Sequence, residues 1–163
     1  LNLIIFSSLQ KFFDLSQNRM SDITFEWDKI LNLKGASAPY IQYTHARLKS
    51  ILRKASRSSF DKLRAGPKIF DTSLLGTSQE LSLLGHLIYF PEVVEQAALR
   101  YEPHVIAGYL LKLSEKANAF YQAAPVLKSE GALRGTRLFL VSASSLVLKN
   151  GLGLLGIEAP EEM

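Results

Sequence analysis

Apolar residues recur at intervals of three and four along most of the chain, and sustained alternation of apolar and polar positions is scarce. The first spacing is typical of amphipathic helices, whereas alternation would indicate strands. The pattern predicts an N-terminal helix over Leu3–Phe13 and a short element around Phe25–Leu31. Gly35, followed by Ala-Ser-Ala, predicts a turn before the next helix.

A long helix is predicted to begin within the run APYIQYTHARLKSILRKA, residues 38–55. Pro39 suits the first turn, where its missing N–H leaves no helical bond unmade. Four apolar residues share one face of this helix and are expected to be buried: Ile41, Leu48, Leu52 and Ala55. The stretch Ser56–Gly76 combines Ser, Gly, Pro and charged residues without clear periodicity, which predicts a basic loop.

The second half of the chain predicts further helices. Thr77 and Glu80 fit a capping box, so a helix is expected to begin there and to end before Pro91. Others are expected over about Glu92–Arg100, from Pro103 for about five turns, and over Leu138–Leu155 with Gly156 as the stop. The predicted buried positions are Ile106, Tyr109, Leu110, Leu113, Ala117 and Phe120, then Leu138, Val141, Ser145, Leu148, Leu152 and Leu155. The fold class expected is all-α, an antiparallel helical bundle.

Composition narrows the class of protein. The 163 residues, 47% hydrophobic and 21% charged, correspond to one folded domain. The chain has no cysteine, which excludes disulfides, thiolate catalysis and cysteine-ligated metal centres. No segment approaches the ~20 apolar residues that span a bilayer, and the start has no secretory signal pattern. Because the sequence opens at Leu1 without a methionine, we expect a cut made inside a longer protein.

Positive charge is concentrated in one stretch. Between Arg47 and Lys68 there are eight basic residues and one acidic residue, while the whole chain carries only +4. Such a concentration is a reasonable footprint for a polyanion, although a solvated helix face followed by a basic loop gives the same pattern.

Sites for chemistry are otherwise scarce. His45, His86 and His104 lie on separate elements without metal-ligand spacing, and each is interpreted as a surface or satisfied core residue. No glycine-rich phosphate loop, nucleophile elbow or Walker pattern is present. The sequence therefore predicts no catalytic residues and no metal site.

Several separated strings resemble one family. The strings DLSQNR from Asp14, FEWD from Phe25 and APYIQYTHAR from Ala38 are similar to the join and first motif of the C-terminal domain of arginyl-tRNA synthetases. Glu102-Pro-His104, Tyr109-Leu110, Phe120-Tyr121 and Pro125-Val126 match later helices of that family in order, and the end from Leu148 to Met163 resembles the usual end of the synthetase. The likeness covers nearly the whole chain.

The resemblance implies the all-helical DALR anticodon-binding domain, of the class I synthetase type, over residues 25–163, with 1–24 as the connecting end of the catalytic region. The implied parent is a cytoplasmic enzyme that attaches arginine to tRNA-Arg using ATP with magnesium, in an upstream catalytic domain absent from this sequence. The fragment alone is expected to bind tRNA. It is not expected to hold a cofactor, to catalyse a reaction, or to bind DNA or a membrane.

Turn spacing places Tyr40, Tyr43 and Arg47 on one helix face, where two phenol rings and a guanidinium could stack on and pair with the splayed bases of an anticodon loop. The same tyrosines could be ordinary core aromatics. The resemblance adds Tyr121 and the terminal Met163 near the anticodon. Phosphate contacts are expected from Lys49, Arg53, Lys54 and Arg57.

Two alternatives stay open at this point. The same domain type occurs in cysteinyl enzymes and glycyl subunits, and a helical protein-interaction module with a basic loop for an acidic partner would share the composition. The apolar run Leu3, Ile4, Ile5 and Phe6 could also drive self-association of the fragment.

Overall fold

The computed structural model describes the backbone of residues 2–20, 37–63 and 70–163 and the side chains of residues 6–20, 37–56 and 70–163. Every regular element in these ranges is helical, which confirms the predicted fold class. The elements are α1 (Asn2–Ser16), α3 (Ala38–Leu63), the 3₁₀ turn η1 (Thr72–Leu74), α4 (Ser78–Ile88), α5 (Phe90–Arg100), α6 (Pro103–Ala123) and α7 (Gly131–Leu154).

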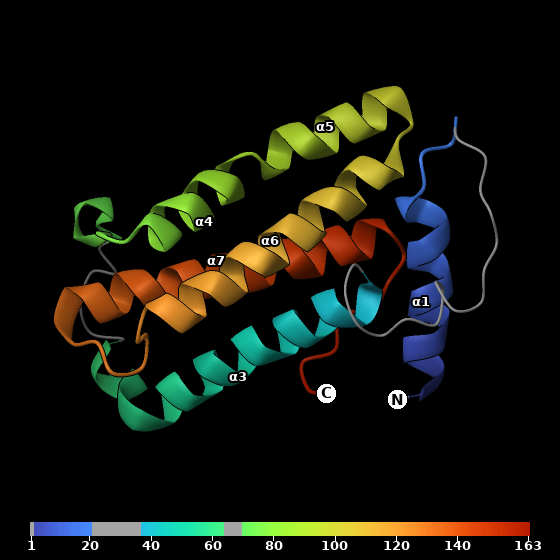
Figure 1. Ribbon diagram of the computed structural model, residues 1–163. Helices are drawn as coiled ribbons and strands as arrows, with labels where there is room; N and C mark the ends of the chain where they lie inside the picture. The colour runs from blue at the N-terminus through green and yellow to red at the C-terminus, as the bar shows by residue number, and fades with distance from the viewer. Residues whose placement is uncertain (1, 21–36, 64–69) are drawn as a thin grey trace.

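The helices α6 and α7 run antiparallel through the middle of the molecule, with α3 on one side and α4 and α5 on the other (Figure 1). Both α3 and α4 contact α6 and α7, while α5 packs on α6. The N-terminal α1 crosses the end of the bundle where α3 begins and α7 ends, and packs on α3 and α6 (Figure 1). Because α3 and α6 run in the same direction, their successive turns can pair along a shared seam.

One continuous apolar core joins the helices. Of the predicted α3 face, Ile41, Leu48 and Ala55 are buried and Leu52 packs against them. All the predicted positions of α6 and of the last helix are buried. Removal of apolar side chains from water is the main favourable contribution to the free energy of folding. The helices therefore turn the apolar faces that their spacing predicts toward the core. Phe12 adds α1 to the same core, whereas Phe6 is half exposed. The side chains of Leu3, Ile4 and Ile5 lie outside the described residues, and self-association stays a prediction.

Most of the predicted helix ends in the second half are confirmed, the start of the last helix excepted. Thr77 Oγ1 accepts the N–H of Glu80 at 3.2 Å, and Glu80 Oε2 accepts the N–H of Thr77 at 2.9 Å, which is the capping box at the start of α4. Pro91 lies in the first turn of α5, where no helical N–H is required. Gly156 follows α7 with φ of +65°, in the left-handed region that favours glycine.

The predicted basic loop over Ser56–Gly76 is wrong for its first part, since α3 continues to Leu63. Serine weakens a helix only mildly. Because no glycine or proline occurs between Pro39 and Gly66, no residue of Ser56–Leu63 is expected to end the helix. The last helix also begins earlier than predicted, at Gly131. The element around Phe25–Leu31, the turn at Gly35 and the boundary between residues 24 and 25 lie outside the described residues.

A membrane span was not expected. None of the described helices has both the length and the apolar character that crossing a bilayer requires.

Candidate nucleic-acid interface

The predicted trio on α3 lies along the border with α6 and reaches solvent. Tyr43 is 53% exposed, and Tyr40 and Arg47 are half-buried. Tyr40 and Thr44 contact Asn118 of α6, and one turn beyond Thr44, Arg47 contacts Tyr121. The two helices thus pair turn by turn, and the trio is not sealed inside the bundle.

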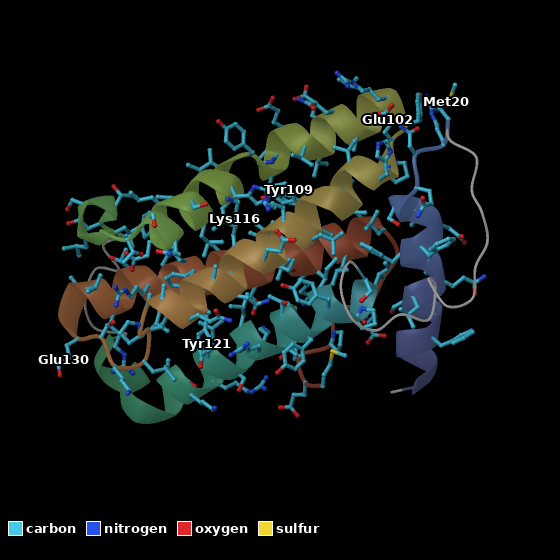
Figure 2. All side chains as sticks on the ribbon, viewed as in Figure 1. Met20, Glu102, Tyr109, Lys116, Tyr121 and Glu130 are labelled. Atoms are coloured by element: carbon cyan, nitrogen blue, oxygen red, sulfur yellow. The ribbon has the colours of Figure 1, made fainter. Side chains whose placement is uncertain are left out.

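Arg47 and Tyr121 form a stacked pair. The guanidinium carbon of Arg47 lies 4.5 Å from the centroid of the Tyr121 ring. Figure 2 shows Tyr121 projecting from α6 toward α3. A cation over an aromatic face contributes about 0.5–1 kcal/mol at an exposed site and holds both planar groups in place. The structure therefore brings together two of the sequence-predicted residues, from helices far apart in the chain, as one flat and positively charged surface.

Two further residues contact this group: Asn118 is half-buried and Thr44 is fully buried. Neither was predicted as a site residue. Asn118 Nδ2 donates to Tyr40 Oη at 3.2 Å and to Thr44 Oγ1 at 3.1 Å. Asn118 precedes Tyr121 by three residues and so shares its helix face, which was the available signal. We call the six residues Tyr40, Tyr43, Thr44, Arg47, Asn118 and Tyr121 the α3–α6 face.

The C-terminal tail lies against α3. Gln42 Nε2 donates to the carbonyl oxygen of Glu158 at 2.7 Å, and His45 Nδ1 donates to that of Pro160 at 2.9 Å. Burial lowers the pKa of His45, in keeping with a neutral ring whose proton sits on Nδ1. These bonds carry the chain end along α3, and the terminal Met163 is 43% exposed. Met163 follows Glu162, which lies against Arg53 of α3, and is not part of the core.

The predicted phosphate-binding cluster is partly occupied by this tail. Lys49 Nζ lies 2.8 Å from Glu161 Oε1, and Arg53 donates to the Glu161 carbonyl oxygen at 3.1 Å and lies 3.4 Å from Glu162 Oε1. The bond from Lys49 lowers the pKa of Glu161. Lys54 is exposed, and the side chain of Arg57 lies outside the described residues. An incoming phosphate would therefore have to compete with carboxylates for Lys49 and Arg53.

Of the two remaining histidines, His86 has structural surroundings, whereas His104 Nδ1 is buried without a hydrogen-bond partner among the described residues. His86 stacks on Tyr109 at a centroid distance of 4.3 Å, and its Nε2 donates to the Tyr109 carbonyl oxygen at 3.2 Å. Burial lowers the pKa of His86 and raises that of the Tyr109 phenol to about 12. Within residues 2–20, 37–63 and 70–163, no group of histidine and carboxylate side chains is placed to hold a metal ion.

Comparison with known sequences gives one family. Residues 41–163 match the family model of the DALR anticodon binding domain. The chain is 48% identical over 142 residues to the arginine–tRNA ligase of Thermococcus kodakarensis, covering 86% of this chain and 22% of that protein. It is 43% identical over 151 residues to the arginine–tRNA ligase of Chloroflexus aurantiacus, covering 92% and 25%.

Comparison with solved structures agrees. The fold matches the arginyl-tRNA synthetase of Thermus thermophilus with a TM-score of 0.81 and 36% identity, over 98% of this chain and 27% of that one. It matches the arginyl-tRNA synthetase of Plasmodium falciparum with a TM-score of 0.80 and 29% identity, over the same shares. The chain spans about a quarter of the length of these relatives.

Proposed function

Because the chain belongs to the DALR anticodon-binding domain family, in the form found in arginine–tRNA ligases, we propose that its α3–α6 face binds the anticodon loop of tRNA-Arg. The observation that carries the proposal is the ring of Tyr43, exposed beside the stacked Arg47 and Tyr121. An aromatic ring that is half exposed to water is not a core residue, and its free face can stack on a base.

The chemistry of an anticodon loop fits this surface. Its bases can leave their stack, lie on aromatic or guanidinium planes and be read along their edges. Stacking of one base on one aromatic ring contributes roughly 1–3 kcal/mol. Arg47 offers a planar fork for a base edge or a phosphate, while Lys54 and the cluster around it attract the RNA backbone without reading sequence. Tyr121 is part of this face, and Met163 borders it in the proposal.

The activity of a longer protein follows from the relatives rather than from this chain. We propose a cytoplasmic parent enzyme in which a separate catalytic domain joins arginine to tRNA-Arg with ATP and magnesium, and in which this domain supplies tRNA recognition. The matched relatives are arginine enzymes, which disfavours a cysteinyl or glycyl origin.

Tyr43→Ala and Arg47→Ala test the proposal against Tyr89→Ala. Tyr89 is an equally exposed tyrosine between α4 and α5, away from α3, and serves as the matched control. In the complete enzyme, the two α3 variants should raise the KM for tRNA about 5- to 150-fold, as expected from one lost stacking contact. The KM values for ATP and arginine, and all three values for the control, should stay unchanged. Unchanged dependence on tRNA in both α3 variants would refute the proposal.

A further inference from the structure

Asn118 is fixed in position by α3 although it belongs to α6. Its Nδ2 uses both hydrogens, one toward Tyr40 Oη at 3.2 Å and one toward Thr44 Oγ1 at 3.1 Å. An amide held at two points cannot rotate freely, so whatever its carbonyl oxygen binds meets a group already oriented.

The hydroxyl of Thr44 determines which way the amide faces. Thr44 Oγ1 donates its only hydrogen to the carbonyl oxygen of Tyr40 at 2.9 Å. The hydroxyl can therefore only accept from Asn118, because a hydroxyl has one hydrogen. The amide nitrogen must face Thr44, and the amide oxygen Oδ1 must point away from it.

Two hydrogen-bonding capacities of this group are left over. Asn118 Oδ1 receives no hydrogen bond from the described part of the chain and is not among its buried unpaired atoms, so it reaches solvent. Tyr40 Oη accepts from Asn118, and no described residue accepts the hydrogen of Tyr40. An acceptor and a donor thus lie side by side on the α3–α6 face, one turn of α6 before the Arg47–Tyr121 pair.

We propose that Asn118 is a specificity-determining residue of the RNA site. Its Oδ1 accepts an N–H from the edge of one loop base, and the Tyr40 hydroxyl donates to the neighbouring acceptor on that edge. This rests on the proposed function. A base whose edge lacks that order of donor and acceptor leaves the fixed oxygen unpaired, and a polar site rejects such a ligand more strongly than an apolar pocket does.

The test uses the full 163-residue chain and a set of RNA hairpins that carry the tRNA-Arg anticodon loop, each with one loop base replaced. Asn118→Ala should weaken binding of the unaltered hairpin roughly 3- to 10-fold, the loss expected for one neutral hydrogen bond. For the hairpin in which the contacted base is replaced, Asn118→Ala and the unaltered chain should bind equally. Gln96→Ala, which removes an exposed amide bonded to Glu92 on α5, is the matched control and should bind every hairpin as the unaltered chain does.

Tyr40→Phe provides a second, milder variant that keeps the ring and removes only the hydroxyl. It should lose discrimination at the same loop position as Asn118→Ala, and it decides the matter if Asn118→Ala does not fold. An equal loss for every hairpin, or a loss no greater than that of Gln96→Ala, would overturn the inference. Failure of the unaltered chain to bind any hairpin would instead overturn the proposed function.

Discussion

A buried ion pair between Glu80 and Arg137 joins α4 to α7, and breaking it tests how much this contact stabilises the bundle. Arg137 Nε lies 2.6 Å from Glu80 Oε1, and the side chain of Glu80 is 0% exposed. The Glu80 carboxylate also accepts the N–H groups of Gly76 and Thr77, while Arg137 Nη1 donates to Ser129 Oγ. These bonds fasten the start of α4 to α7 and to the loop after α6.

Replacement of Arg137 by leucine leaves the Glu80 carboxylate buried without its cation. Breaking a buried pair costs about 3–5 kcal/mol. Because Glu80 keeps its two backbone N–H donors, we expect the lower end, about 3 kcal/mol. For a domain of this size, each kcal/mol lowers Tm by about 2–4 °C, so Tm should fall by about 6–12 °C.

Thermal unfolding followed by circular dichroism measures this change, with Lys112→Leu as the control. The Lys112–Glu115 pair has a similar separation of 2.8 Å, but its side chains are 60% and 56% exposed. An exposed pair contributes at most about 1 kcal/mol, so the control should move Tm far less. Equal shifts in Arg137→Leu and Lys112→Leu would refute the reasoning.

The dependence of the free energy of unfolding on acid pH is a second test of the Glu80–Arg137 pair. Burial raises the pKa of Glu80, but bonds from Thr77 and Arg137 outweigh it and leave this pKa below its ordinary 4.5. A carboxyl with a lowered pKa stabilises the fold above pH 4.5 and loses that contribution as the pH falls through its folded value. Without Arg137, the loss should begin at a higher pH.

Three further predictions follow from other contacts. Glu161→Gln frees Lys49 from its carboxylate, so tRNA should bind more tightly at low salt. The slope of the logarithm of the binding constant against the logarithm of the salt concentration should become steeper by about 0.7–0.9. Unchanged binding would show that the tail does not compete. In Gly151→Ala the new Cβ meets the side chain of Leu110, and urea denaturation should show a loss of about 1–3 kcal/mol, whereas an unchanged midpoint would contradict this packing. The pKa of His45 is lowered by burial, so the free energy of unfolding should fall as the pH drops below 6.5, and His45→Gln should show a shallower fall; the same slope in both would contradict this assignment.

The sequence predicted the parts of the fold that repeat. The faces of α6 and α7 recur over many turns, so the apolar period identified six of the eight buried residues of α6 and five of the ten of α7. The capping box located the start of α4 to the residue. The end of α3 was missed because serine and charge alone do not break a helix, and only a glycine, a proline or tertiary contacts settle where such a helix ends.

From residue spacing alone the candidate site was predicted only as far as one helix allows, and the family resemblance added Tyr121 and Met163. The spacing of Tyr40, Tyr43 and Arg47 put them on one face, but which helix borders that face is a tertiary property. Asn118 therefore went unrecognised until α6 was seen beside α3. The acidic tail was visible in the sequence, yet nothing in it indicated that Glu161 would pair with Lys49.

Recognition of an anticodon loop by the α3–α6 face is the function that we propose. The most direct measurement compares two affinities of the chain: one for intact tRNA-Arg, and one for the same tRNA in which only the anticodon loop has been exchanged. Both are measured at a fixed salt concentration near 150 mM, where exposed charges are screened beyond about 8 Å. We expect the exchange to remove most of the binding, and Tyr43→Ala to remove the difference between the two tRNAs. Equal binding of both tRNAs by the unaltered chain would contradict the proposed function.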